Sequence, residues 1–229
     1  MTESADNRHL AACIDHTLLR ADAQTADIQR LCQEAADFGF AAVCVNPSYA
    51  ALAVSLLCNC PVRVAAVANF PLGASTDAAL VAETCALINA GVDEIDMVMN
   101  IAAAKDGNWQ AVDQGIQAVV GQAQPAGLIV KLIIETCLLS EAEKVRACAA
   151  ALAANVDFVK TSTGFSTSGA TLADVCLLRR SVGQDIGVKA SGGIRTREDA
   201  LAMLAAGANR LGTSFGVAII GQGQQHPAS

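Results

Sequence analysis

The sequence predicts a single-domain α/β protein whose strands close into a (β/α)8 TIM barrel. Strand-like and helix-like segments alternate along all 229 residues, which is typical of a parallel sheet covered by helices. Eight such units in a chain of this length fit a closed barrel. An open, doubly wound sheet is the alternative. It usually carries a Gly-x-Gly-x-x-Gly turn after its first strand, and this sequence has none there.

Each element has its own local signal. Short apolar runs bounded by turn formers predict eight strands, at 13–15, 42–45, 62–68, 94–99, 128–134, 156–160, 187–190 and 210–212. Helices are predicted at 25–37, 77–89 and 109–122. Three more helices begin at capping pairs, namely Ser140 with Glu143, Thr171 with Asp174 and Thr196 with Asp199. We expect the barrel to occupy residues 1–220 and the Gly-, Gln- and Pro-rich residues 221–229 to form a flexible C-terminal tail.

A weak internal repeat sets the register of alternate strands. Four helix-to-strand turns resemble one another, and each carries a residue suited to a left-handed helix C-cap: Gly39, Gly91, Asn155 and Gly207. Five residues after these caps come Cys44, Asp96, Lys160 and Gly212. Alternate strands of a (β/α)8 barrel contribute side chains to one interior layer. We therefore expect these four residues at one height, near the C-terminal mouth where the active sites of such barrels lie.

Composition limits the classes of function. A net charge of −7 and a pI near 4.9 argue against a general nucleic-acid or anionic-membrane binder. The nine cysteines are odd in number and include no Cys-x-x-Cys pair, which favours reduced thiols in a cytoplasmic protein. We expect no signal peptide and no membrane span, because the first residues are polar and no apolar run is long enough. The three histidines form no ligand cluster, so we expect no metal ion and no other cofactor.

Four charged residues interrupt apolar strand sequences: Asp96, Lys131, Lys160 and Lys189. An isolated lysine near a strand end most often reaches water. Four charges on neighbouring strands of a barrel cannot all do so. An internal ion pair accounts for Asp96 with one lysine and leaves two cations, so the sequence predicts an anionic ligand or a chemical role at this position.

Lysine becomes a nucleophile when its pKa falls. Burial and a neighbouring cation both disfavour the ammonium form, and the neutral amine can attack a carbonyl to form a Schiff base. Lys160 and Lys189 lie on adjacent predicted strands, so we expect each to lower the pKa of the other. Asp96 is then placed to move a proton to and from the adduct.

Small residues after three strands predict a site for substrate. Thr163 and Gly164 belong to the polar loop that directly follows Lys160. The loops after the seventh and eighth strands, where phosphate commonly binds in this fold, contain Gly192, Gly193, Gly212 and Ser214. Glycines let backbone N–H groups approach an anion. Each loop taken alone is also consistent with an ordinary glycine-rich turn.

Several motifs resemble those of the deoxyribose-phosphate aldolase family. They are Phe-Val-Lys-Thr-Ser-Thr-Gly-Phe at 158–165, Val-Lys-Ala-Ser-Gly-Gly-Ile-Arg at 188–195 and Glu-Ile-Asp-Met-Val-Met-Asn at 94–100. Ile-Asp-His-Thr at 14–17 and Val-Cys-Val-Asn-Pro at 43–47 also match, so the resemblance covers nearly the whole chain. Two departures are Phe215, where the family often has a small residue, and a C-terminal tail without the tyrosine that some members carry.

The resemblance implies a class I aldolase on a (β/α)8 barrel. Its reaction would be the reversible cleavage of 2-deoxy-D-ribose 5-phosphate into D-glyceraldehyde 3-phosphate and acetaldehyde. Lys160 would form the Schiff base, and Asp96 and Lys189 would be the proton donor and acceptor pair. The residues that would line the site include Asp15, Cys44 and Lys131.

Two other readings stay open at this point. One is a different lysine-dependent aldolase or a phosphate-binding isomerase on the same barrel. The other is a regulatory barrel that only binds a phosphorylated sugar, although binding alone requires no neutral buried amine. The expected partners are small phosphorylated sugars and aldehydes, with no nucleic acid and no membrane. A homodimer is an expectation that no motif in the sequence tests.

Overall fold

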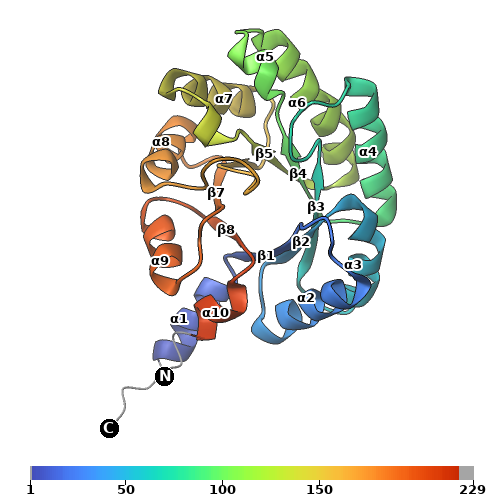
Figure 1. Cartoon of the computed structure of the whole chain (residues 1–229), viewed down its shortest axis with the longest axis vertical. Coiled ribbons are helices and arrows are strands. Elements are labelled where there is room, and N and C mark those ends of the chain that lie inside the picture. Colours follow the sequence, from blue (N-terminus) through green and yellow to red (C-terminus); the bar gives the residue numbers. More distant parts are fainter. Residues whose placement is uncertain (1, 222–229) are drawn as a thin grey trace.

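Eight parallel strands close into a barrel, as the sequence predicts (Figure 1). The computed structural model describes residues 2–221. Each strand pairs with the next in sequence, and β8 pairs with β1 to close the ring. The strands are β1 Ile14–Leu18, β2 Ala42–Val45, β3 Arg63–Ala68, β4 Glu94–Val98, β5 Ile129–Ile133, β6 Phe158–Lys160, β7 Gly187–Ser191 and β8 Arg210–Thr213.

Helices surround the barrel on its outer side (Figure 1). They are α1 Thr2–Ala11, α2 Thr25–Phe38, α3 Ala50–Leu57, α4 Asp77–Ala90, α5 Ile101–Lys105, α6 Trp109–Ala123, α7 Glu141–Ala153, α8 Leu172–Val182, α9 Arg197–Ala205 and α10 Gly216–Gly221. Three single turns of 3₁₀-helix are η1 Pro47–Tyr49, η2 Gln124–Ala126 and η3 Thr136–Leu138. No described helix combines the length and apolar character needed to cross a bilayer.

The predicted caps position the helices and the strands that follow them. Ser140 and Thr196 each form a complete capping box, and the Thr171 side chain accepts from the N–H of Asp174. The four residues of the predicted repeat all have positive φ, at 66° for Gly39, 82° for Gly91, 55° for Asn155 and 111° for Gly207. The repeated turn predicted from the sequence is therefore confirmed.

Four helices were not predicted, and each lacks the usual sequence signals. Helix α1 is largely polar, α5 and α10 are only one to two turns long, and α3 follows directly after the 3₁₀ turn at Pro47. One boundary needs correction. Gly221, predicted as the first tail residue, is the last residue of α10, and residues 222–229 lie outside the described part of the chain.

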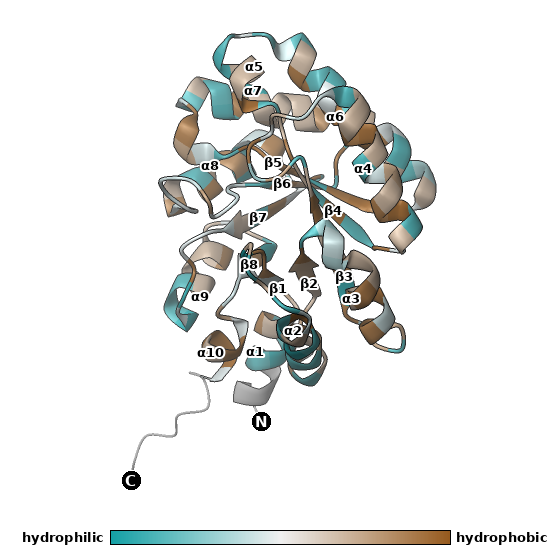
Figure 2. Ribbon diagram, turned by 45° about the vertical axis from the view of Figure 1, so that its right-hand side comes forward, coloured by the Kyte–Doolittle hydropathy of each residue, from teal (hydrophilic) through white to brown (hydrophobic). Residues whose placement is uncertain are grey.

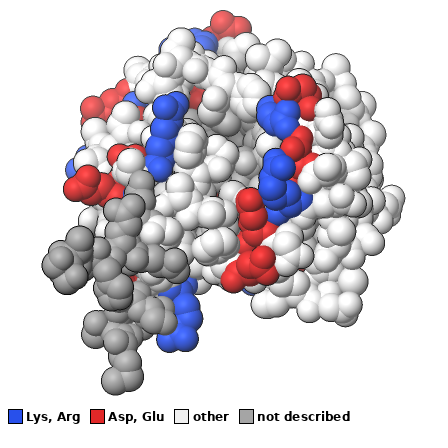
Figure 3. All heavy atoms as spheres, turned by 60° about the horizontal axis from the view of Figure 1, so that its bottom comes forward, with Lys and Arg blue, Asp and Glu red and all other residues white. Residues whose placement is uncertain are grey.

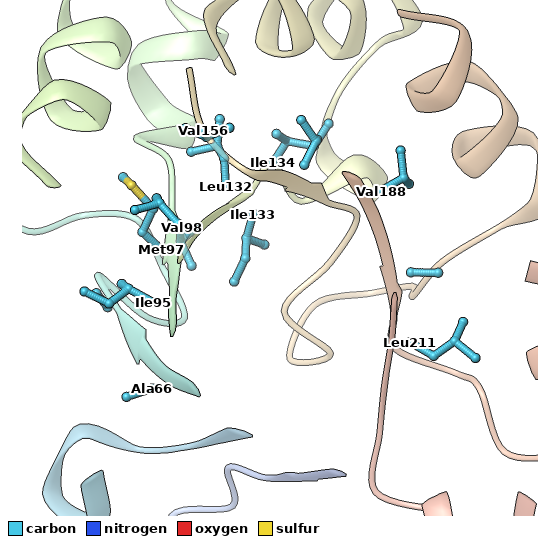
Figure 4. Close-up of a cluster of buried hydrophobic side chains, with 14 of the residues drawn as sticks. Ala66, Ile95, Met97, Val98, Leu132, Ile133, Ile134, Val156, Val188 and Leu211 are labelled. Carbon is cyan, nitrogen blue, oxygen red and sulfur yellow. The ribbon is translucent and has the colours of Figure 1, made fainter. Parts of the chain in front are cut away.

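The apolar core lies between the strands and the helices. The inner faces of the helices are brown in the hydropathy view, and their outer faces carry most of the hydrophilic residues (Figure 2). Ile95, Val188 and Leu211 point from their strands toward this layer and are fully buried (Figure 4). Because successive strand residues face opposite sides, the residues beside them point to the barrel interior.

Charges on the outer surface are mixed. On the face in Figure 3, acidic and basic side chains lie beside one another, and no large area is of one sign. Arg20, Asp22, Asp27 and Arg30 form such a mixed group of ion pairs around the start of α2.

Candidate active site

Asp96 lies at the centre of a cluster of three lysines inside the barrel. Its Oδ1 accepts a hydrogen bond from Lys131 Nζ at 2.6 Å. Its Oδ2 accepts from Lys160 Nζ at 2.8 Å and from Lys189 Nζ at 2.7 Å. The four residues come from the consecutive strands β4 to β7, and all are buried. The structure therefore brings together the charged residues that the sequence analysis singled out.

Asp15, on β1, joins this cluster from the other side of the barrel. It accepts from the Lys189 ammonium through Oδ2 and from Arg210 Nε through Oδ1 at 2.7 Å. The Arg210 guanidinium reaches Glu94 Oε2 at 2.9 Å, and Lys131 Nζ lies 2.5 Å from the same oxygen. All these side chains are buried, so each charge has a partner of opposite sign.

Glu94 and Arg210 are functional candidates that the sequence analysis missed. The signal was present, because a strand places residues two apart on the same face. Glu94 lies two residues before Asp96, and Arg210 lies two residues before Gly212. Once Asp96 and Gly212 were assigned to the interior, the same alternation assigned Glu94 and Arg210 to it.

The predicted interior layer is present. Cys44 Sγ lies 3.9 Å from Asp96 Oδ2, and Lys160 contacts the same oxygen, so these three side chains point inward together. Gly212 faces them from β8. A Cβ atom there would lie 2.9 Å from Ser191 Cβ and 3.1 Å from Lys189 Cε, so the lack of a side chain makes room for the Lys189 stem.

The environment separates the two central lysines. Burial lowers the pKa of Lys160, and the charge of Lys189 lowers it further against the opposing effect of Asp96. Burial acts on Lys189 in the same direction, but Asp15 and Asp96 outweigh it and raise the Lys189 pKa. The expectation that each lysine would depress the other therefore holds for Lys160. It is wrong for Lys189, because Asp15 gives Lys189 a second carboxylate.

The other charged groups in the cluster keep their charges. Burial opposes ionisation of Asp96, but Lys131, Lys160 and Lys189 together hold its pKa well below the usual range. Burial likewise opposes the charge on Lys131, and the carboxylates of Asp96, Asp15 and Glu94 together outweigh that effect, so the Lys131 pKa is raised. Burial raises the pKa of the Cys44 thiol, which therefore stays neutral at pH 7.

A cavity of about 350 Å³ opens at the C-terminal mouth of the barrel above Lys160. Among the interior lysines, only Lys160 lines it. The predicted substrate-binding residues in its wall are Thr163, Gly164, Gly192, Gly193, Gly212 and Ser214. Asp15, Cys44 and Lys131, which were also predicted to line the site, belong to the ion cluster beneath and not to the wall of this cavity.

Two arginines in the cavity wall were not predicted. Arg20 is paired with Asp22 at 2.8 Å and with Asp27. Arg195 places its guanidinium 5.7 Å from the ring centre of Phe215, so this unusual aromatic residue forms a cation–π contact at the cavity edge.

The region 9–222 matches the family model described as DeoC/LacD family aldolase. The chain belongs to this aldolase family. A deoxyribose-phosphate aldolase of Geobacillus sp. (strain WCH70) is 55% identical over 212 residues, covering 93% of this chain and 95% of that protein. One from Streptococcus equi subsp. zooepidemicus (strain MGCS10565) is 54% identical over 207 residues, covering 90% and 93%.

Solved structures of similar proteins share the barrel. A putative deoxyribose-phosphate aldolase from Coccidioides immitis aligns with a TM-score of 0.92 at 39% identity, covering 96% of this chain and 87% of that one. The deoxyribose phosphate aldolase from Aeropyrum pernix, described as a unique tetrameric structure, aligns with a TM-score of 0.89 at 31% identity, covering 97% and 96%.

An aromatic pair covers part of the mouth of this aldolase. Phe165, in the loop after β6, meets Phe70, in the loop after β3, edge to face at 5.3 Å between ring centres. Phe70 also packs on the interior group that includes Cys44 and Val67. The pair therefore places apolar surface between the loops after β3 and β6, beside the cavity that Lys160 lines.

Proposed function

We propose that this aldolase reversibly cleaves 2-deoxy-D-ribose 5-phosphate into D-glyceraldehyde 3-phosphate and acetaldehyde through a Schiff base on Lys160. One observation carries the assignment of the nucleophile. Lys160 is the lysine that both lines the cavity and has a lowered pKa. The relatives at more than 50% identity support the reaction, since each is a deoxyribose-phosphate aldolase by name.

The balance of charge in the interior supports a neutral Lys160. Three carboxylates, on Asp15, Glu94 and Asp96, face the three basic groups of Lys131, Lys189 and Arg210, whose pKa values are all raised against the effect of burial. These six charges cancel. Arg63 reaches Glu94 from a half-exposed position at 3.3 Å and is solvated on its other side. A charge on Lys160 would be an additional buried cation, which is costly.

The proposed cleavage proceeds through a Schiff base and an enamine on Lys160. The Lys160 amine adds to C1 of the open-chain sugar, and loss of water gives the protonated Schiff base. A base removes the proton from the C3 hydroxyl, the C2–C3 bond breaks, and its electron pair forms the enamine while C3 becomes the aldehyde of the leaving product. Protonation of the enamine at C2 and hydrolysis then release acetaldehyde and the Lys160 amine.

Asp96 and Lys189 are proposed to relay the protons of these steps. Their hydrogen bond of 2.7 Å joins a carboxylate and an ammonium beside Lys160. Lys189 starts as the donor, because its pKa is raised, and Asp96 is the acceptor that links the two lysines. Asp15 and Lys131 are proposed to hold this charge arrangement, and Cys44 to pack against Asp96 as a neutral thiol.

The phosphate is proposed to bind at the opposite end of the cavity. Gly192 and Gly193 both have positive φ and expose backbone between β7 and α9, and Ser214 follows β8 beside them. Thr163 and Gly164 would complete the wall. Arg195 supplies a positive charge at this end.

The proposal also includes a reaction that needs no metal ion, a cytoplasmic location and a homodimer. Residues 2–221 contain no group of three His, Cys, Asp or Glu side chains placed to hold a metal ion.

Trapping of the adduct tests this function. The enzyme is incubated with acetaldehyde and borohydride, and the modified residue is located by mass spectrometry. We expect a reduced adduct on Lys160, no adduct in Lys160→Ala, and an unchanged adduct in Lys105→Ala, whose lysine is on the surface. An adduct on Lys189 with none on Lys160 would reverse the assignment, and turnover without any adduct would exclude the Schiff base.

A further inference from the structure

Glu135 has an unusual conformation next to the proposed catalytic lysine. It follows β5 and has φ 55° and ψ 67°, in the left-handed region that residues other than glycine rarely adopt. Its side chain is buried, and it forms no ion pair with any described residue of the chain. A strained backbone and a buried carboxylate both cost stability, so the surrounding contacts must favour this arrangement.

Three of the hydrogen bonds to the Glu135 carboxylate come from Thr163, and the Cys137 thiol lies 4.0 Å from Oε1. The Thr163 N–H lies 3.2 Å from Glu135 Oε1 and 3.3 Å from Oε2, and its hydroxyl donates to Oε2. The Thr163 hydroxyl oxygen in turn accepts from the N–H of Phe165 at 3.0 Å. One carboxylate therefore fixes both the backbone and the side chain of Thr163, and through it the start of the segment beyond Gly164.

Backbone hydrogen bonds place Glu135 beside the end of β6. Ile134 N–H donates to the carbonyl of Lys160 at 3.0 Å, and Thr136 N–H donates to the carbonyl of Thr161 at 2.9 Å. Strand β6 ends at Lys160, and the pairing continues to Thr161, whose N–H donates to the carbonyl of Lys189 at 3.0 Å. The backbone of the 134–136 segment binds the loop as far as Thr161. The Glu135 side chain binds it two residues further on, at Thr163, which lines the cavity.

We propose that Glu135 is a positioning residue that acts through Thr163 to hold the loop 161–165 against the catalytic cavity. Thr163, Gly164 and Phe165 all line that cavity, and Thr163 and Phe165 also border a second, mostly apolar cavity of about 330 Å³ on the far side of the loop. The clamp keeps the loop between the two cavities. Without it the loop can shift toward the second cavity and widen the first.

The inference rests on the proposed function only for the identity of the substrate. Loss of the clamp should weaken binding of the sugar phosphate, which spans the cavity, more than it affects Lys160 itself. In Glu135→Gln an amide N–H₂ faces the Thr163 donors, so we expect KM for 2-deoxyribose 5-phosphate to rise about tenfold, the scale of one lost hydrogen bond to a charged group. We expect kcat to change by a smaller factor and acetaldehyde trapping on Lys160 to persist.

Variants at Thr163 test the route of the effect. Thr163→Val removes the hydroxyl that donates to Glu135 and should raise KM as Glu135→Gln does, and Thr163→Ser, which keeps the hydroxyl, should raise it less. In the double variant the two increases should not multiply, because both remove the same contact. Glu143→Gln is the matched control: that carboxylate accepts from a backbone N–H at 2.6 Å on the surface, and KM should not change.

A readout without substrate separates this inference from the proposed reaction. Amide hydrogen exchange at Thr163 should be slow in the wild type and in Glu143→Gln, and fast in Glu135→Gln. Glu135→Gly, which relieves the backbone conformation and deletes the carboxylate, provides a second folded variant with the same expectation. Slow exchange at Thr163 with unchanged KM in both Glu135 variants, or fully multiplicative effects with Thr163→Val, would overturn the proposal whatever the substrate is.

Discussion

At the scale of single residues, Lys160 and Lys189 occupy similar positions but have different neighbouring groups. Both donate to the same oxygen of Asp96, and their Cα atoms are register partners on adjacent strands. Lys189 has Asp15 as a second carboxylate, whereas Lys160 has the cavity. In the resting protein the same residue type is therefore a cation at one position and a candidate neutral amine at the other.

Replacing Lys189 should raise the pKa of Lys160. In Lys189→Leu the neighbouring cation is gone while Asp96 remains, so the Lys160 pKa should rise toward the free value of about 10.4. Each unit of rise lowers the neutral fraction at pH 7 about tenfold. We expect trapping by borohydride to be weak at pH 7 and restored at alkaline pH. Trapping with the wild-type pH dependence would show that Lys189 does not control the amine.

Arg210 should matter for stability more than for chemistry. Its guanidinium pairs with Asp15 and Glu94 inside the barrel, and truncation leaves two buried carboxylates short of a partner. Removal of one partner from a buried ion pair costs about 3–5 kcal/mol. Urea unfolding of Arg210→Met should show a loss of this size, and Arg146→Met, at an exposed pair, should lose less than about 1 kcal/mol.

At the scale of elements, the loops after β7 and β8 form one unit. The Thr213 hydroxyl donates to the carbonyl of Ile194 at 2.7 Å, and Phe215 lies under Arg195. The departure at Phe215 thus has a structural account, because its ring holds an arginine of the neighbouring loop at the proposed phosphate end.

A negative charge in this unit should act selectively. Ser214→Asp should repel the phosphate dianion and raise KM for 2-deoxyribose 5-phosphate, with a much smaller effect on unphosphorylated deoxyribose. Ser55→Asp, on an exposed face of α3, serves as the control and should change neither. Equal effects of Ser214→Asp on the two sugars would assign the loop to folding and not to phosphate recognition.

Elements that are set by nearby residues, such as capped helices, could be predicted from the sequence. Features that depend on contacts between residues far apart in the sequence could not. The caps at Ser140 and Thr196 lie within four residues of the bonds they make, and the helices they open were located correctly. Glu135 carries no local signal for a left-handed conformation. The hydrogen bonds of its carboxylate with Thr163 join residues 28 apart, so only the closed barrel reveals them.

At the scale of the whole molecule, closure of the barrel assembles the charged interior. Asp15 on the first strand binds Arg210 on the last, 195 residues later. The alternation of strand residues placed most of the interior charges in advance, but which charge meets which depends on how the ring closes. The balance of charge around Lys160 is therefore a property of the complete fold.

Stability should depend on the ionisation of these carboxylates. The pKa of Asp96 is well below its usual range in the folded protein, so it contributes stability above the unfolded pKa of about 3.9 that is lost as pH falls below it. We expect the free energy of unfolding, measured in urea, to decrease steadily from about pH 5 downward. A free energy that stays constant down to pH 3 would contradict the ionised state of the cluster.

Gly212 matters to this aldolase because it lacks a side chain, although it has no reactive group. The Lys189 stem passes close to the space that a side chain of residue 212 would occupy, on its way to Asp15 and Asp96. An inventory of reactive groups would omit this position, and a substitution by alanine would look conservative in any survey of variants. Yet an added Cβ there would press on Ser191 and on the Lys189 stem, so we expect Gly212→Ala to lower activity by shifting the Lys189 ammonium relative to Asp96.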